Sequence, residues 1–125
     1  FLRAAETEGL LAALSLSARE FFLKFAEGDG SLIAEIFAEA IRDDAISASL
    51  RAADRQSVAL FIKAIRAAQV RREIDAALDP ELVANTLFAA IEGIGLRRAF
   101  LRDTDVEASV AQFRALAERY LSQRS

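Results

Sequence analysis

The chain of 125 residues contains no cysteine, no histidine, no methionine and no tryptophan. Without cysteine it can form no disulfide, no thiolate nucleophile and no cysteine-ligated metal site. Without histidine it lacks the commonest general base and the commonest metal ligand, and no serine has a histidine to activate it. We therefore predict that the protein is not an enzyme and that it carries no metal or other cofactor.

Helix breakers and long apolar runs are also scarce. There are one proline and five glycines, and no run of alternating polar and apolar residues indicates a strand. Charged residues interrupt every apolar stretch before it reaches the ~20 residues of a membrane span, so we expect no membrane association. No secretory signal is visible, which predicts a cytoplasmic protein. A net charge of −3 gives these residues no electrostatic footprint for nucleic acid.

What remains is a composition typical of a folded helical domain, with 54% hydrophobic and 28% charged residues. Helical spacing of the apolar residues predicts an all-α fold, an antiparallel bundle of about six helices with short connections. We expect helices over residues 2–14, 18–27, 31–42, 45–73, 80–101 and 105–121. One continuous helix over 2–27 is an alternative to the first two.

Capping residues set most of these boundaries. The expected caps are the capping boxes Ser17/Glu20 and Thr104/Glu107, the N-caps Ser31 and Asp44, and Asp79 followed by Pro80 at the first helical position.

The helix predicted over 80–101 has two apolar faces and two glycines, Gly93 and Gly95, although each glycine weakens a helix by roughly 1 kcal/mol. One face can pack on the protein's own core, and the other then needs a partner. For Gly95 we expect packing within the chain. For Gly93 we predict close approach of a second copy, with the last two helices of each copy forming a four-helix bundle in a homodimer. The predicted interface comprises Leu82, Ala89, Gly93, Leu96, Phe100, Phe113 and Tyr120.

The stretch "SLIAEIFAEAIRDD" precedes a long helix, then "RREIDAALDPELVANTLFAAIEGIGLRRAFL" and a capped final helix. This layout, over at least residues 17–121, resembles the C-terminal regulatory domain of the TetR family of transcription regulators. The resemblance implies that 17–125 is a ligand-binding and dimerisation domain and that 1–16 ends the helix that connects it to a DNA-binding domain. The family's N-terminal helix-turn-helix has no counterpart here, and a start at Phe1 predicts a piece of a longer chain. Operator DNA is expected to be bound only through that other domain.

The resemblance also implies a cavity inside each subunit for a small hydrophobic or aromatic ligand. Such cavities are mostly apolar, with a few polar groups that orient the ligand. The residues expected to contact it are Phe21, Phe25, Phe37, Asp54, Ser57, Phe61, Ile65, Gln69 and Phe88. Asn85 and Glu92, in a polar seam of the helix over 80–101, are further candidate polar contacts.

Three functions are compatible with these observations. The first is the ligand-sensing and dimerisation domain of a TetR-like repressor, in which a small apolar ligand alters the affinity for DNA. The second is a stand-alone helical dimerisation or adaptor module with a solid core and no ligand. The third is a small bundle that carries a lipid without regulating anything.

Overall fold

The computed structural model describes residues 1–122, except for the side chain of residue 29, and this part is built from helices without a strand. The elements in chain order are α1 (Leu2–Glu8), α2 (Leu10–Lys24), a kinked turn η1 (Phe25–Asp29) with Gly28 at φ +97°, α3 (Gly30–Arg42), α4 (Asp44–Val70), α5 (Pro80–Phe100) and α6 (Val106–Leu121). The prediction of an all-α bundle of about six helices is confirmed.

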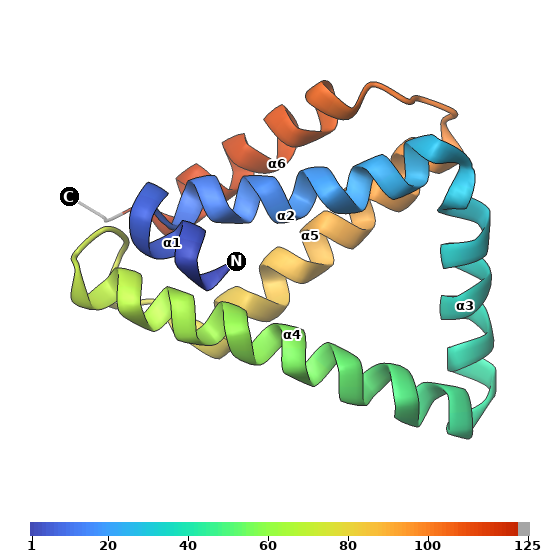
Figure 1. Cartoon of the computed structure of the whole chain (residues 1–125), viewed down its shortest axis with the longest axis horizontal. Coiled ribbons are helices and arrows are strands. Elements are labelled where there is room, and N and C mark those ends of the chain that lie inside the picture. The colour runs from blue at the N-terminus through green and yellow to red at the C-terminus, as the bar shows by residue number, and fades with distance from the viewer. Residues whose placement is uncertain (123–125) are drawn as a thin grey trace.

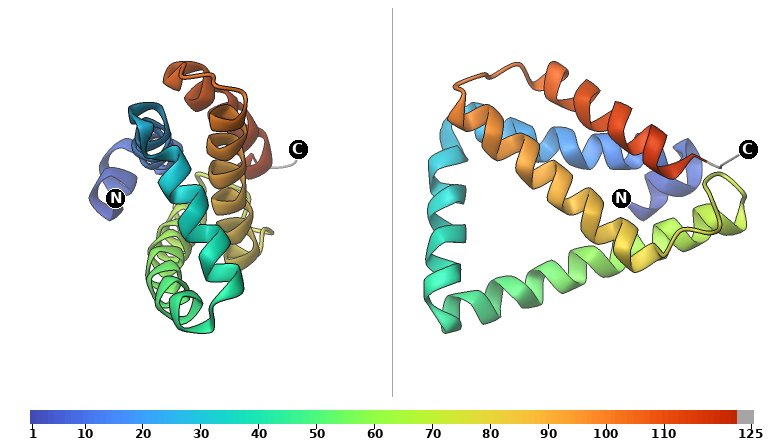
Figure 2. Two further views of the ribbon diagram at one scale, coloured as in Figure 1. Left: turned by 90° about the vertical axis from the view of Figure 1, so that its right-hand side faces the viewer. Right: turned by 180° about the vertical axis from the view of Figure 1, so that it is seen from behind.

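The helices enclose a roughly triangular frame (Figures 1 and 2). Helix α2 packs against α6, and α5 packs against α4. Helix α3 stands across the far end of the frame and joins the end of α2 to the start of α4 (Figure 1). This arrangement places α3 away from the centre of the core. Side chains of α3 and of its neighbouring helices line the space between them.

The core lies where α1, α2, α4, α5 and α6 meet. Its largest fully buried side chains are Leu10, Leu14, Ile65, Val83, Leu87 and Phe113. Helix α3 buries only Gly30, while Phe37 stays 45% and Ile41 86% exposed. The apolar stripe of this helix therefore does not enter the core, which its periodicity alone could not reveal.

One predicted N-cap is confirmed, and two observed N-caps lie one residue away from the predicted ones. Asp79 accepts a hydrogen bond from the backbone N–H of Glu81 at 3.0 Å, with Pro80 at the start of α5 as predicted. The cap of α4 is Asp43 and not Asp44, and the cap of α6 is Asp105 and not Thr104. In each case an aspartate that stands next to the predicted cap supplies the acceptor oxygen. Ser31 lies inside α3, which begins at Gly30.

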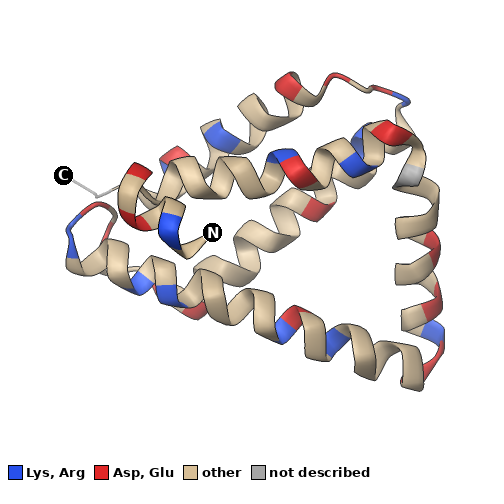
Figure 3. Ribbon diagram, viewed as in Figure 1, with Lys and Arg blue, Asp and Glu red and all other residues tan. Residues whose placement is uncertain are grey.

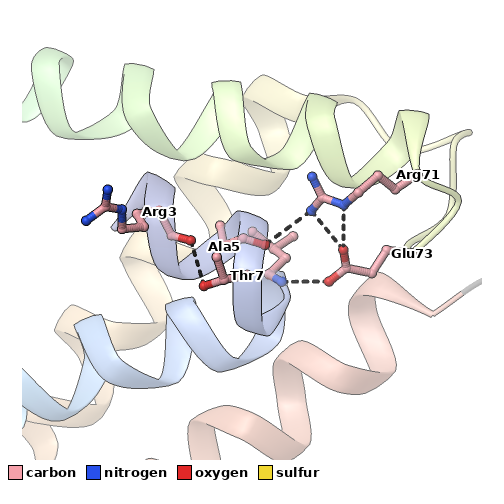
Figure 4. Close-up of polar contacts among 6 residues, drawn as sticks. Arg3, Ala5, Thr7, Arg71 and Glu73 are labelled. Carbon is pink, nitrogen blue, oxygen red and sulfur yellow. Dashed lines mark hydrogen bonds and ion pairs between the residues drawn. The ribbon is translucent and has the colours of Figure 1, made fainter.

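The predicted helix over 2–14 and the predicted helix start at residue 18 are wrong, and so is the alternative of one continuous helix over 2–27. The break lies at Gly9, whose φ of +97° favours glycine, and α2 continues through Ser17. A distant residue caps α2, because Glu73 in the α4–α5 loop accepts a 2.6 Å hydrogen bond from the backbone N–H of Leu10 (Figure 4). Arg71 binds the other carboxylate oxygen of Glu73 at 2.8 Å and also donates to the carbonyl of Ala5. No local pattern around residue 9 announces this cap.

Candidate functional site

A cavity of about 360 Å³ opens between α2, α3, α4 and α5. Its size lies within the range of small-molecule sites. The lining consists of Phe1, Ser17, Phe21, Phe37, Asp54, Ser57, Leu60, Phe61, Phe88, Ile91 and Glu92. We call it the aromatic cavity. Six of the nine residues predicted to contact a ligand lie around it: Phe21, Phe37, Asp54, Ser57, Phe61 and Phe88.

The floor of the aromatic cavity is buried, and its rim is exposed to solvent. Phe61 and Ile91, each 6% exposed, form the floor. The ring of Phe61 lies 4.5 Å from that of Phe1 and 4.4 Å from that of Phe88, centroid to centroid, so three rings from three parts of the chain meet there. Asp54 and Ser57 are exposed at the rim. A molecule entering here would pass polar groups before it reached the phenyl rings.

A second cavity, of about 390 Å³, lies between α3 and α5 and shares Phe21, Phe37 and Glu92 with the first. Its other lining residues are Phe25, Ile33, Ala34, Ala38, Ile41, Gly93 and Leu96. Phe25, the seventh predicted contact, lies here. Because the two cavities share these three side chains, a rotamer change in one of the shared residues would alter both spaces.

Gly95 leaves room for two phenyl rings to pack against α5. A Cβ at this position would lie 2.9 Å from Cε2 of Phe25 and 3.0 Å from Cε1 of Phe21. These two rings pack edge to face, with centroids 5.0 Å apart. The glycine thus allows both rings to lie against α5, which confirms the expectation that Gly95 packs within its own chain.

Glu92 is the titratable side chain that both cavities share. Partial burial raises the pKa of its carboxyl group, and the nearby charge of Asp54 raises that pKa further. Within residues 1–122, no hydrogen-bond donor and no Lys or Arg contacts the carboxylate of Glu92 or that of Asp54. The site therefore holds two acidic groups without a counter-charge.

Three other residues that were expected to contact the ligand lie outside both cavities. Ile65 is fully buried in the core and lines neither cavity. The amide of Gln69 donates to the carbonyls of Leu78 at 2.8 Å and Asp75 at 3.2 Å, which secures the α4–α5 loop. Asn85 donates to the carbonyl of Glu81 at 2.9 Å on the surface of α5. For each of these residues the structure supplies an intramolecular role.

Sequence reasoning missed four residues of the aromatic cavity: Phe1, Ser17, Leu60 and Ile91. Ser17 stands one helical turn before Phe21, so helical spacing could have found it had α2 not been started at residue 18. Phe1 could not have been found, because its position depends on the turn at Gly9.

Most residues of the predicted interface lie on the surface of the chain. Leu82, Leu96 and Phe100 are 61%, 51% and 80% exposed, and Ala89 and Gly93 are exposed beside them. A Cβ added at Gly93 would have no neighbour within 4 Å. Phe113, in contrast, is 0% exposed in the chain's own core, so its placement in the interface is wrong. Tyr120 is half-buried against that core.

Several charged residues lie close together at the turn between α5 and α6. A cavity of about 400 Å³ between this turn and η1 is lined by Arg98, Arg102, Asp103 and Asp105, together with apolar residues. A backbone N–H of Asp105 donates to Asp103, and together with the Arg98 ion pair it holds the pKa of the Asp103 carboxyl below its usual value. Because Arg98 and Asp103 satisfy one another, this turn is explained by local structure. Over the residues described, no group of acidic side chains gathers as a metal site requires.

The described residues thus form an all-helical domain with two apolar cavities beside α3. A family model described as "BetI-type transcriptional repressor, C-terminal" matches residues 6–124. The chain belongs to this family of transcriptional regulator domains, and the resemblance to TetR-family regulatory domains is confirmed. No curated protein and no solved structure matches the chain significantly. None of the helices within residues 1–122 is long and apolar enough to cross a membrane.

Proposed function

We propose that this chain is the ligand-sensing and dimerisation domain of a transcriptional repressor, and that the aromatic cavity is its ligand site. The observation that carries the proposal is the coincidence of the family match with a phenyl-lined cavity that is open to solvent. The ligand is small and mainly hydrophobic or aromatic, because rings supply most of the buried lining.

The ligand acts on the rest of the repressor through the N-terminal end of the chain. Phe61 on the cavity floor stacks on Phe1, which immediately precedes α1. The other end of α4 leads into Arg71 and Glu73, which hold the junction between α1 and α2. A ligand that shifts α4 therefore shifts α1 and any DNA-reading domain before it. The ligand does so only as far as it binds the two positions with different affinity.

Dimerisation uses the exposed stripe of α5. Leu82, Thr86, Ala89, Gly93, Leu96 and Phe100 recur at alternating intervals of four and three residues, the spacing of a helix seam that meets another helix. Large apolar side chains flank the small residues in the middle of this stripe. Two copies related by a twofold axis would cover it, and a dimer would place two DNA-reading domains on half-sites about 34–36 Å apart.

A thermal-shift screen with small apolar and aromatic compounds tests the ligand site. A compound at a hundredfold excess over its dissociation constant should stabilise the protein by about 2.7 kcal/mol. Ser57→Phe, which places a ring at the cavity rim, should abolish the response. Ser49→Phe, exposed on the same helix but outside both cavities, should keep it.

If no compound stabilises the protein, or if Ser57→Phe and Ser49→Phe respond alike, the aromatic cavity is not the site. The adaptor hypothesis would then account better for the chain, although the cavities do not favour the solid core that it expects.

A further inference from the structure

We propose that the ligand of the aromatic cavity is a lipophilic amine, a hydrophobic or aromatic body that carries a protonated nitrogen with at least one N–H, which binds the carboxylate of Glu92. This inference rests on the proposed ligand site and adds the chemical class of its occupant. It replaces a purely apolar ligand with an amphipathic, positively charged one.

The carboxylate of Glu92 has no hydrogen-bond or ion-pair partner among the described residues. Glu92 is partly buried and its carboxylate oxygens still reach solvent, so a ligand that covered them without pairing the charge would bury that charge at a cost. Within the described residues, nothing donates to Glu92, and its neighbour Asp54 adds a second negative charge. No Lys or Arg side chain lines either cavity in that part of the chain. A cation from outside would supply the missing charge and the missing donor together.

The two carboxylates, Asp54 and Glu92, lie at different depths of the aromatic cavity. Asp54 is exposed at the rim, where it attracts cations from solution, and Glu92 lies deeper between the two cavities. Phe21, Phe61 and Phe88 line the same space, and ring faces attract cations as well as apolar groups. An anionic ligand would meet two like charges, and a neutral apolar one would leave Glu92 without a partner.

Hydrogen bonding to Glu92 separates amines that carry an N–H from quaternary ammonium ions. A carboxylate with free lone pairs binds a charged N–H donor about twice as strongly as it binds a neutral donor. A quaternary ammonium offers charge without a donor. The structure therefore favours an amine with an N–H over a fully methylated nitrogen of the same body.

Calorimetric titration with three matched probes tests the inference: 4-phenylbutylamine, its N,N,N-trimethyl derivative and the neutral 4-phenylbutanol. We expect the amine to bind about 10-fold or more tightly than the alcohol, with the trimethyl compound between them. Glu92→Gln should remove most of the amine's advantage and leave the alcohol unchanged. Asp54→Asn should have a smaller effect, because Asp54 is exposed.

The control is Glu35→Gln, an exposed carboxylate of α3 that lines neither cavity, and it should change no affinity. Glu92→Gln should fold, because it removes a charge that burial disfavours. If the alcohol and the amine bind equally, the amine inference fails while the ligand site stands. If the trimethyl compound matches the amine, Glu92 does not act as a hydrogen-bond acceptor. If none of the probes binds and the thermal-shift screen is also negative, the proposed function fails with it.

Discussion

Gly93 and Gly95 stand two residues apart on α5, yet their surroundings are opposite. Nothing lies within 4 Å of a Cβ added at Gly93, whereas a Cβ at Gly95 would press on the rings of Phe25 and Phe21. Residue type alone gives no hint of this difference. The difference follows from the geometry of α5, which turns Gly93 to the surface and Gly95 towards the rings of Phe21 and Phe25.

This contrast yields a stability prediction at the residue scale. Gly95→Ala forces two rings to move, and overpacking of this kind costs about 1–3 kcal/mol, more than the ~1 kcal/mol that alanine gains in a helix. Gly93→Ala gains helix propensity and meets no clash in the chain. Because Gly93 also lies in the proposed dimer stripe, the comparison belongs in the Leu96→Glu/Phe100→Glu background, in which we expect a monomer. Urea denaturation there should show a lower unfolding free energy for Gly95→Ala and an equal or higher one for Gly93→Ala. Equal effects of the two substitutions would contradict the packing described for Gly95.

Sequence reasoning at this scale succeeded for side chains that follow helical periodicity. Phe21, Phe61 and Phe88 were predicted to line a cavity and lie around one. Ile65 and Gln69 were expected to contact the same ligand, but Ile65 lies in the core and Gln69 binds the α4–α5 loop. Position along a helix decides which neighbour a face meets, and the sequence of that helix does not contain this information.

At the scale of elements, the junction of α1 and α2 depends on a residue from the other end of α4. Glu73 caps α2 through the N–H of Leu10, and Gly9 adopts a φ that other residues rarely adopt. The charged residues in Figure 3 are spread over the helices with both signs, and Arg71 and Glu73 connect the end of α4 to the α1–α2 junction through their hydrogen bonds with Ala5 and Leu10.

Removal of this cap should destabilise the fold. Glu73→Ala loses the hydrogen bond to Leu10 and the ion pair with Arg71, and loss of a helix cap costs about 0.5–2 kcal/mol. Glu73→Gln keeps an acceptor oxygen and should lose less. Thermal unfolding monitored by circular dichroism would rank the wild type above Glu73→Gln and Glu73→Ala last. A Glu73→Ala variant as stable as the wild type would show that α2 needs no such cap.

Helix boundaries illustrate what local patterns can and cannot predict. The start of α5 at Asp79-Pro80 follows from two adjacent residues and is confirmed. The Ser17/Glu20 pair matches a capping box but lies within α2, because a distant carboxylate starts that helix eight residues earlier, at Leu10. A cap that depends on tertiary structure is invisible to any local pattern.

At the scale of the whole molecule, the single chain leaves an apolar stripe of α5 exposed to solvent. Leu96 and Phe100 are more than half exposed on a helix whose opposite side is buried. The four-helix dimer was predicted from the two apolar faces of this helix, and it stays a prediction. The part of it that placed Phe113 in the interface was wrong, because this ring is fully buried in the core of its own chain.

Sedimentation equilibrium at micromolar concentration tests this account most directly, with the double variant Leu96→Glu/Phe100→Glu beside the wild type. The control is Leu32→Glu, an equally exposed leucine on α3, away from the α5 stripe. We expect the wild type and the control to sediment at twice the 13.6 kDa mass of the chain, and the double variant at that mass. A wild type that sediments as a single 13.6 kDa chain would contradict the dimer and the regulatory reading built on it.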